Sequence, residues 1–370
     1  MKKVYAIILS SLFCAVIVLG AALTVFLEKP DFSEEENRYL ADFPRLSSFS
    51  LENSDYFDKV ETFLSDRFPM RKELVSARSL LLYLSGNREI GGAYVTEKGY
   101  IERWSEYDEK NVIDNCRAIE KFCTENENIN TEALIIPTAA RIYKELLPSG
   151  APNVDQDMIY ENIETYLENV RLINPTEYML ASKQEQLFYK TDPHINTRGA
   201  AAIYKYFCSK HGFELPQNLT YTAVSDTFYG TLDSKVLYDF SSPDDIEICR
   251  YNMMPTVHAV TRGIDRNTLY DNEKLSQKDK YSYFLGGNYG EITISTYGST
   301  GRNLLVFKDS FANVLVPYLI KDYDTIHLID PRYYYYDLDT YIQTEDITDC
   351  LFIYNIKNFS TDSSLYELLG

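Results

Sequence analysis

Four apolar residues, 304–307, end abruptly in a polar turn that contains Ser310, and the apolar-rich segment 311–320 follows at once. A short apolar run of this kind predicts a buried strand of a parallel sheet, and the segment after it predicts a helix. Two more buried strands are expected close behind, at residues 325–329 and 350–354. Connections of this length predict right-handed βαβ units. The chain is therefore expected to be an α/β protein with a parallel sheet flanked by helices.

Helical and extended patterns continue along the rest of the chain. A buried strand is expected at residues 133–136 and a short hairpin within 91–101. Apolar residues at helical spacing predict helices that contain residues 56–64, 71–84, 112–123 and 159–170, and a helix capped by Thr197 that carries Ala200, Tyr204 and Cys208. Between about 216 and 290 the pattern weakens, so we expect an irregular excursion that shapes a substrate cleft.

Residues 4–27 contain no charged side chain. At about 1.5 Å rise per residue, a helix of this length exceeds the roughly 30 Å hydrocarbon core of a bilayer. Lys2 and Lys3 precede the stretch, which favours a cytoplasmic N-terminus and a single-pass protein of the cell membrane whose remaining chain lies outside. A cleaved signal peptide is the alternative, because Gly20, Ala21 and Ala22 are small.

These patterns divide the chain into parts. Residues 1–3 are predicted to be a cytoplasmic tip and 4–27 a transmembrane anchor, residues 28–87 a stalk with juxtamembrane helices, and residues 88–370 an α/β domain that contains the 216–290 excursion.

Composition limits the partners and cofactors. The formal net charge of −19 argues against nucleic acid as a partner and against docking on an anionic membrane surface. The 32 tyrosines suit stacking on sugar rings, although many are expected to pack in the core. Histidine, cysteine and carboxylate residues show no metal-ligand spacing, so we expect neither a metal nor another cofactor. Disulfides are left open, because nothing in the sequence identifies the pairs.

Ser310 is expected at the edge of the sheet where α/β proteins bind ligands. A serine there faces backbone N–H groups and the positive end of a helix, which suits a nucleophile beside an oxyanion. Asp192 and His194 follow a segment, 187–190, that is expected to be extended, so both side chains would lie on one face. Together the three residues are a candidate nucleophile, base and orienting carboxylate. The alternatives are an ordinary surface pair for Asp192 and His194 and a helix cap at Ser310.

The other three histidines have poorer contexts. His211 is expected at a helix C-terminus, His327 inside a buried strand and His258 in the irregular region. None of these positions brings a histidine to the predicted edge of the sheet, so His194 is the preferred base.

Further residues are weaker candidates for binding substrate or an oxyanion. Arg332 follows a strand and either holds a negative charge of the substrate or pairs with a neighbouring aspartate. Gly287 and Asn288 offer a backbone N–H and a side-chain amide near an oxyanion, or else form an ordinary turn. The four tyrosines 333–336 either stack on sugars or pack inward.

Several motifs resemble those of the bacterial DHHW proteins. The segment TDPHINTRGA, at residues 191–200, resembles the TDHHWTxxGA element of that family. Other short matches lie at residues 32–40, 66–71, 134–138, 228–232, 308–311 and 329–333. The chain departs from the pattern at Pro193, which replaces a histidine, at Ile195, which replaces a tryptophan, and at Ala139 and Ala140, where a basic residue is usual.

The resemblance carries implications of its own. DHHW proteins are similar to the alginate O-acetyltransferases, which implies an SGNH-hydrolase-like domain with reordered elements. It also implies that Asp192, His194 and Ser310 are a catalytic triad, and that a membrane-bound O-acyltransferase partner passes acetyl groups across the bilayer.

Three functions are compatible with these features. The leading hypothesis is a membrane-anchored extracytoplasmic O-acetyltransferase that acts on a cell-surface or exported polysaccharide through an acetyl-serine. The second is a carbohydrate acetylesterase, with water as the acceptor. The third is a non-catalytic glycan-binding or scaffold subunit of an exopolysaccharide machine.

Overall fold

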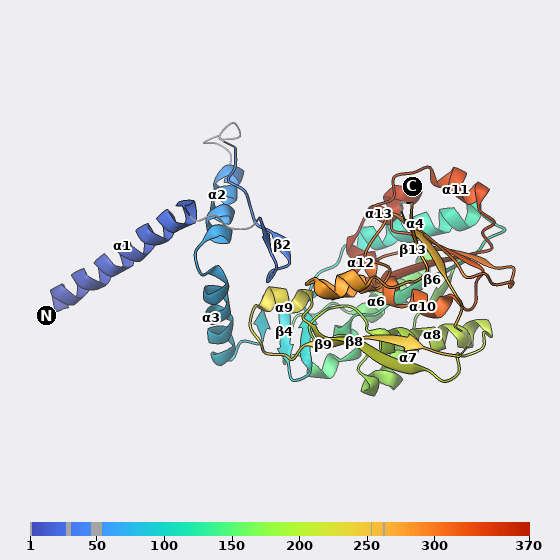
Figure 1. Ribbon diagram of the computed structural model, residues 1–370, viewed down its shortest axis with the longest axis horizontal. Helices are drawn as coiled ribbons and strands as arrows, with labels where there is room; N and C mark the ends of the chain where they lie inside the picture. The colour runs from blue at the N-terminus through green and yellow to red at the C-terminus, as the bar shows by residue number, and fades with distance from the viewer. Residues whose placement is uncertain (1, 27–30, 46–53, 253, 262) are drawn as a thin grey trace. The chain divides into compact units, whose positions relative to one another are not determined.

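The computed structural model describes residues 2–26, 31–45, 54–252, 254–261 and 263–370. The chain forms two compact units, the first made of residues 1–91 and 233–239 and the second of 92–232 and 240–370 (Figure 1). The first unit contains the N-terminal helices, and the second contains the α/β sheet.

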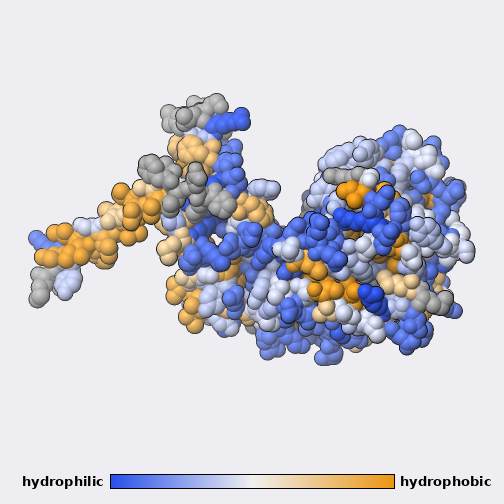
Figure 2. Space-filling model, in the orientation of Figure 1, coloured by the Kyte–Doolittle hydropathy of each residue, from blue (hydrophilic) through white to orange (hydrophobic). Residues whose placement is uncertain are grey.

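The N-terminal helix α1 (Lys2–Phe26) is apolar along its length, and Figure 2 shows its surface as almost continuously hydrophobic. Its span Lys3–Thr24 is long and apolar enough to cross a membrane, a test that a signal sequence also passes. Residue 27, the last of the predicted anchor, lies outside the described residues, as do 28–30 and 46–53 of the predicted stalk and juxtamembrane region.

The rest of the first unit contains two predicted helices, α2 (Ser54–Arg67) and α3 (Arg71–Leu84). The strands β1 (Phe32–Ser33) and β2 (Arg38–Tyr39) form a small antiparallel hairpin in the predicted stalk. Arg38 donates two hydrogen bonds to the buried carboxylate of Asp66, at 2.6 and 2.8 Å. Arg71 donates to Glu36 at 2.7 Å. These ion pairs tie the hairpin to the two helices, so this part of the predicted stalk is folded.

The second unit is built on an eight-stranded sheet with the order β11-β10-β12-β14-β13-β15-β6-β7. Strands β14, β13, β15, β6 and β7 are mutually parallel, and the remaining three are antiparallel to their neighbours. The strands are β6 (Asn130–Ile136), β7 (Arg171–Ile173), β10 (His258–Thr261), β11 (Ile264–Arg266), β12 (Glu291–Ser295), β13 (Asn303–Lys308), β14 (Thr325–Ile329) and β15 (Asp349–Asn355). The predicted buried strands are confirmed, and so is their parallel arrangement.

Helices cover both faces of this sheet. The helices are α4 (Glu109–Glu125), α5 (Ala139–Ile142), α6 (Gln156–Tyr166), α7 (Thr176–Ser182), α8 (Thr197–His211), α10 (Val316–Leu319), α11 (Leu338–Thr344), α12 (Ile356–Thr361) and α13 (Ser364–Leu369). In Figure 1, α4, α12 and α13 lie over one face, and α7 and α8 lie over the other. The predicted hairpin is formed by β4 (Ala93–Thr96) and β5 (Gly99–Glu102).

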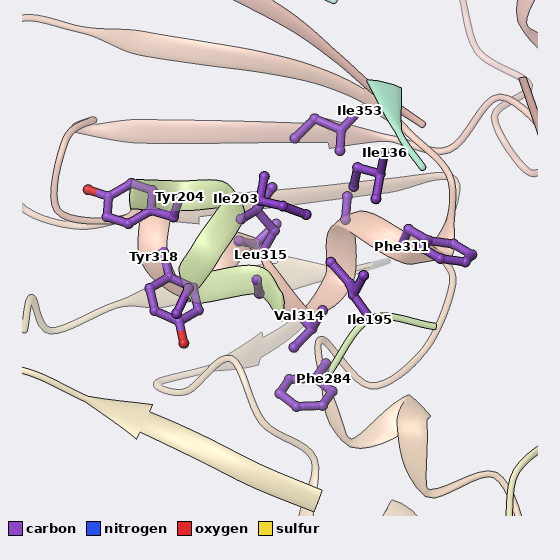
Figure 3. Close-up of a cluster of buried hydrophobic side chains, with 14 of the residues drawn as sticks. Ile136, Ile195, Ile203, Tyr204, Phe284, Phe311, Val314, Leu315, Tyr318 and Ile353 are labelled. Atoms are coloured by element: carbon purple, nitrogen blue, oxygen red, sulfur yellow. The ribbon is translucent and has the colours of Figure 1, made fainter. Parts of the chain in front are cut away.

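Alternation along the strands divides the apolar residues into two cores. Leu305 and Phe307 of β13 pack with α4, whereas Leu304 and Val306 of the same strand pack with α8. Phe307 stacks on Phe352 of the neighbouring strand, with ring centroids 5.0 Å apart. Figure 3 shows part of the core on the α8 face. Both faces of β13 are therefore buried, which explains its continuous apolar run.

The segment 311–320 is not the single helix that we expected. Residues Ser310–Val314 form a 3₁₀ helix, η6, and α10 begins only at Val316. Pro317 lies in the first turn of α10, where its missing N–H is tolerated, but it cannot donate the hydrogen bond that one continuous helix would need. Ser310 consequently does not lie at the end of a long helix dipole.

Two helix boundaries also differ from the prediction. Helix α6 ends at Tyr166, and Val170, which we assigned to it, is a buried residue that leads into the unpredicted short strand β7. The N-cap of α8 is Asn196 rather than Thr197, because the Asn196 side chain accepts hydrogen bonds from the N–H groups of Arg198 and Gly199.

The described residues of the region 216–290, which exclude 253 and 262, form no long helix, in agreement with the weak pattern, but much of the region is extended. Strands β8 (Thr220–Phe228) and β9 (Asp244–Arg250) form an antiparallel hairpin, and β10 and β11 extend the main sheet. Most of β8 is exposed or half-buried, so it lacks the apolar alternation by which a strand is recognised in sequence.

Candidate active site

A cavity of about 260 Å³ lies across the carboxyl ends of four neighbouring parallel strands. Thr138 follows β6, Ser310 follows β13, Arg332 follows β14 and Asn355 ends β15, and all four residues line the cavity. Parallel α/β sheets bind their ligands at this edge. The position that the sequence predicted for Ser310 is therefore the one it occupies.

The three predicted triad residues meet in this cavity. The Nε2 atom of His194 lies 2.7 Å from the Oγ atom of Ser310, across 116 positions of sequence. The Nδ1 atom of His194 lies 2.5 Å from Oδ1 of Asp192. Because a carboxylate only accepts hydrogen bonds, Nδ1 carries the hydrogen, and Nε2 is left to accept the Ser310 hydroxyl proton. The geometry is that of a nucleophile, a base and an orienting carboxylate.

Asp192 and His194 lie in a tight turn after residues 187–190, so a turn, and not an extended backbone, places their side chains on one side. The turn is closed by an isolated antiparallel bridge between Phe188 and Ile195, and the N–H of Tyr189 donates to the carbonyl of His194 at 3.2 Å. The His194 N–H donates to Oδ1 of Asp192 at 3.1 Å. The two side chains are therefore brought together by an Asx-type turn, with Pro193 between them.

A glycine and a threonine far along the chain hold the Asp192 carboxylate. The backbone N–H of Thr231 donates to Oδ2 of Asp192 at 2.8 Å. A Cβ atom on Gly230 would lie 2.3 Å from Cβ and 2.5 Å from Oδ2 of Asp192. The backbone can thus approach the carboxylate only because residue 230 has no side chain. Gly230 and Thr231 belong to one of the short segments that carried the family resemblance, but the sequence did not indicate this role.

The electrostatics of the pair support ionised Asp192 beside a basic His194. Burial alone would raise the pKa of Asp192, but the charge and hydrogen bonds of His194 and the Thr231 N–H outweigh it and lower that pKa below the ordinary value. Burial opposes the charged form of His194, yet the Asp192 carboxylate prevails and raises the pKa of the imidazole. The imidazole is therefore a stronger base than a free histidine.

Tyr281 contacts both His194 and Ser310, and no sequence pattern predicted this role. Its ring stacks on the His194 imidazole with centroids 4.0 Å apart and an interplanar angle of 15°. Its hydroxyl donates to the backbone carbonyl of Ser310 at 2.8 Å. Tyr281 lies in the region where we predicted only an irregular excursion, and it restrains base and nucleophile together.

The turn that carries Ser310 is fixed by the buried Asp309. Oδ1 of Asp309 accepts the Phe311 N–H at 2.8 Å, and Oδ2 accepts the Asn355 N–H and the Asn358 amide, each at 2.8 Å. The Phe311 N–H is thus occupied within the turn. No hydrogen bond to the Ser310 N–H is found among the described residues, so this N–H is a candidate oxyanion donor.

Arg332 lines the cavity and is also paired with a neighbouring aspartate, the alternative that we considered. It donates two hydrogen bonds to the fully buried Asp330, at 2.7 and 2.8 Å. Burial opposes the Arg332 charge, but Asp330 dominates and raises the pKa of the guanidinium. The Nζ atom of the fully buried Lys308 lies 3.7 Å from the same carboxylate. Asp330 thus orients Arg332 at the cavity wall.

Gly287 and Asn288, the other candidate oxyanion residues, do not line the cavity. The Gly287 N–H donates to the carbonyl of Phe284 within a turn. The Asn288 side chain accepts from Asn313, which follows Ser310 in the 3₁₀ helix. Gly287 therefore belongs to an ordinary turn. Asn288 supports the Ser310 turn through its hydrogen bond with Asn313.

The remaining sequence candidates lie elsewhere. His211 pairs with Glu132, His258 lies near Asp265, and the buried His327 has its pKa lowered to about 4 by burial. The aromatic run 333–336 does not line the cavity: Tyr334 is buried and the other three tyrosines are exposed or half-buried. Within the described residues, no group of three or more histidines, cysteines or carboxylates is arranged to hold a metal.

The three departures from the motif have different consequences. Ile195 is fully buried and does not line the cavity, and Figure 3 shows it in the core beside Val314 and Phe284. It therefore supports the His194 turn and does not contact a ligand. Pro193, Ala139 and Ala140 do line the cavity, and the two alanines leave this part of the wall small and uncharged.

Comparisons with known proteins agree with this architecture. A family model described as DHHW protein matches residues 131–329, which is more than half of the chain. A DHHW family protein from Eubacterium siraeum has a TM-score of 0.63 and 21% identity, covering 75% of this chain and 94% of its own. Bacillus cereus PatB1, solved with a sulfonyl adduct, has a TM-score of 0.62 and 19% identity, covering 75% and 98%.

A more distant structure is the O-acetyltransferase domain of Pseudomonas putida AlgJ, with a TM-score of 0.46 and 13% identity, covering 75% of this chain and 98% of its own. No functionally curated sequence matches the chain. At these identities the two closer likenesses establish the fold, and the predicted SGNH-hydrolase-like α/β architecture is confirmed.

Proposed function

Given that the chain belongs to the DHHW protein family, we propose that it is an extracytoplasmic O-acetyltransferase that modifies a polysaccharide through a Ser310–His194–Asp192 triad. The observation that carries the proposal is the pair of contacts at His194, 2.7 Å to Ser310 and 2.5 Å to Asp192. The acetyl group and the polysaccharide acceptor come from the family resemblance.

The reaction proceeds in two steps. Oγ of Ser310 attacks the carbonyl carbon of an acetyl donor while Nε2 of His194 takes the hydroxyl proton. The Ser310 N–H stabilises the oxyanion, with the Arg332 guanidinium as a second positive group at the cavity wall. The tetrahedral intermediate expels the donor's leaving group, which takes the proton from His194, and acetyl-Ser310 remains.

In the second step a sugar hydroxyl attacks acetyl-Ser310. His194 takes the proton of that hydroxyl and then returns it to Oγ as the serine leaves, so the triad is restored and the acetyl ester is on the sugar. Neither a metal nor a redox group takes part in these steps.

The N-terminal helix α1 supports a location at the outer face of the cell membrane. We propose that it is retained as an anchor and that a membrane-bound O-acyltransferase delivers the acetyl group. Such a partner would explain how an acetyl donor reaches an enzyme outside the cytoplasm.

Covalent labelling tests the proposal directly. A serine-directed fluorophosphonate is expected to modify the unaltered protein at Ser310 and to leave Ser310→Ala unlabelled, with unchanged circular dichroism. A matched control is Ser209→Ala, an exposed serine of α8. Absence of labelling in the unaltered protein would favour the non-catalytic scaffold instead.

Transfer and hydrolysis are then separated by competition. With p-nitrophenyl acetate as donor, added glycan should decrease the amount of acetate that an acetyltransferase releases by hydrolysis, and acetylated sugar should appear instead. If glycan leaves hydrolysis unchanged and takes up no acetyl group, the protein is an acetylesterase.

A further inference from the structure

We propose that a second cavity, beside the Ser310 cavity, binds the sugar residues that flank the one being acetylated. The proposal rests on the proposed function, because it extends the same site along an oligosaccharide. It assigns to this chain an acceptor several sugar rings long, not a single small alcohol.

The two cavities are adjacent. The second has a volume of about 390 Å³, within the range of roughly 300–1,000 Å³ that is typical of small-molecule sites. Tyr100 and Ala139 line both cavities, so these two side chains lie between the two spaces. Tyr100 is fixed there, because its hydroxyl accepts a hydrogen bond from the Phe240 N–H. A chain molecule with one ring at Ser310 would reach the second cavity by passing these two side chains.

The walls of the second cavity suit sugar rings. Tyr100, Tyr143 and Phe188 are aromatic residues of the wall, and each is less than a tenth exposed, so only part of each ring borders the cavity. The exposed side-chain amides of Gln184 and Gln186 also line this cavity, and they offer both hydrogen-bond donors and acceptors to hydroxyl groups. A sugar needs this combination, because one side of the ring is apolar and its edge is polar.

Charge at the rim is also available to the ligand. Lys183 is paired with Glu145 at 2.7 Å, whereas Lys190 donates to Ser242 and to the Pro243 carbonyl, and its charge also acts on the buried Asp244. Lys98 lies exposed at the same rim. Ammonium groups of this kind serve as hydrogen-bond donors to the hydroxyl or carboxylate oxygens of sugars.

Two residues that line the cavities each carry a buried polar atom for which the described part of the chain provides no hydrogen-bond partner. The atoms are Nε1 of Trp104, at the Ser310 cavity, and the hydroxyl of Tyr189, at the second cavity. Both residues are more than nine-tenths buried, with exposures of 4% and 3%. Buried polar groups are usually satisfied, so these two side chains keep hydrogen-bonding capacity that no described protein group uses.

Binding is measured on full-length Ser310→Ala, so that no chemistry intervenes. Trp104 is the single tryptophan of the chain and lies in the catalytic cavity, so its fluorescence reports occupancy. The probes are cellohexaose and a galacturonate hexamer, one neutral and one carboxylated. We expect at least one to bind, and Ser241→Phe, which fills the second cavity, to raise its Kd at least tenfold.

The control is Ser209→Phe, at an exposed serine of α8 outside both cavities, which should leave the Kd unchanged. Gln184→Phe, at an exposed position, is a second filling variant in case Ser241→Phe folds poorly. Failure of both hexasaccharides to bind, or the same Kd in the filled variants as in the control, would overturn the proposal. Failure of the proposed function would give a different result. Fluorophosphonate would then not label Ser310, while sugar binding would still be weakened by the substitutions that fill the second cavity.

Discussion

The phenol ring of Tyr281 lies flat on the imidazole of His194, while its hydroxyl holds the backbone carbonyl of Ser310 at 2.8 Å. One side chain thus restrains the base and the nucleophile, which come from separate parts of the chain. The Ser310–His194 distance therefore depends on a residue that touches both and takes no proton itself. This makes Tyr281 a positioning residue with separable contributions from its ring and its hydroxyl.

The contribution of Tyr281 can be divided by two substitutions. Tyr281→Phe keeps the stacked ring and loses one hydrogen bond, worth about 1 kcal/mol, so acylation of Ser310 should slow by roughly threefold to tenfold. Tyr281→Leu loses both contacts and should slow it further. The measurement is the burst rate with p-nitrophenyl acetate, with the exposed Tyr336→Phe as control. Equal burst rates in all three variants would contradict the positioning role.

The raised pKa of His194 sets the pH dependence of acylation. The imidazole accepts the Ser310 proton only when it is neutral, so the rate should fall as the pH drops through the His194 pKa. Because Asp192 raises that pKa above the ordinary value of 6.5, the midpoint should lie above 6.5.

The variant Asp192→Asn is the control for this pH dependence of the acylation rate. In Asp192→Asn the opposing carboxylate charge is absent and burial lowers the His194 pKa, so the midpoint should move to lower pH and the plateau should decrease. If the midpoint is the same in the unaltered protein and in Asp192→Asn, the group that titrates is not His194.

Replacement of Gly230 should slow the reaction of Ser310. In Gly230→Ala the new Cβ would lie 2.3–2.5 Å from Asp192 atoms, so the carboxylate must move away from His194. We expect fluorophosphonate labelling to slow by at least tenfold. Gly298→Ala is a matched control, since its Cβ would lie 2.5 Å from the Asp324 carboxylate, which is not in the cavity. Comparable slowing in both variants would indicate a general loss of stability.

Asp330 should contribute more to stability than an exposed aspartate. It is fully buried and holds Arg332 at 2.7 Å, with Lys308 Nζ 3.7 Å away, so Asp330→Asn leaves the Arg332 guanidinium without its carboxylate. Removal of one partner from a buried ion pair costs about 3–5 kcal/mol. The free energy of unfolding in urea should fall by about that amount, compared with a negligible change for the exposed Asp226→Asn. A loss below about 1 kcal/mol would be inconsistent with this network.

Much of the sheet was accessible from sequence. Residues 304–307 and 350–354 are buried on both faces and form continuous apolar runs, which are typical of a covered parallel strand, and the run 326–329 is interrupted only by the buried His327. The strands β8 and β7 were missed because one is largely exposed and the other has only three residues. The segment 311–320 was assigned as one helix because its apolar content hides the interruption before Pro317.

Only some residues of the candidate site could be predicted from the sequence. Ser310, His194 and Asp192 could be identified because the chain has only four histidines, because Ser310 follows a predicted buried strand, and because the motif around residues 191–200 has a family precedent. Tyr281 was not distinguishable among 32 tyrosines, and Trp104 and Tyr100 carried no local signal. Contacts such as these join residues that are distant in the chain, and no local pattern records them.

By itself the sequence determined the α/β class, the apolar N-terminal segment and the three polar side chains available for chemistry. These properties follow from local composition and periodicity, which fix which backbone segments must be covered or exposed. Only the tertiary structure decided the 2.7 Å contact of His194 with Ser310, the support from Gly230 and Tyr281, and the position of Tyr100 between the two cavities. Such relationships depend on how elements far apart in the chain pack around two cores, and packing is a property of the folded molecule as a whole.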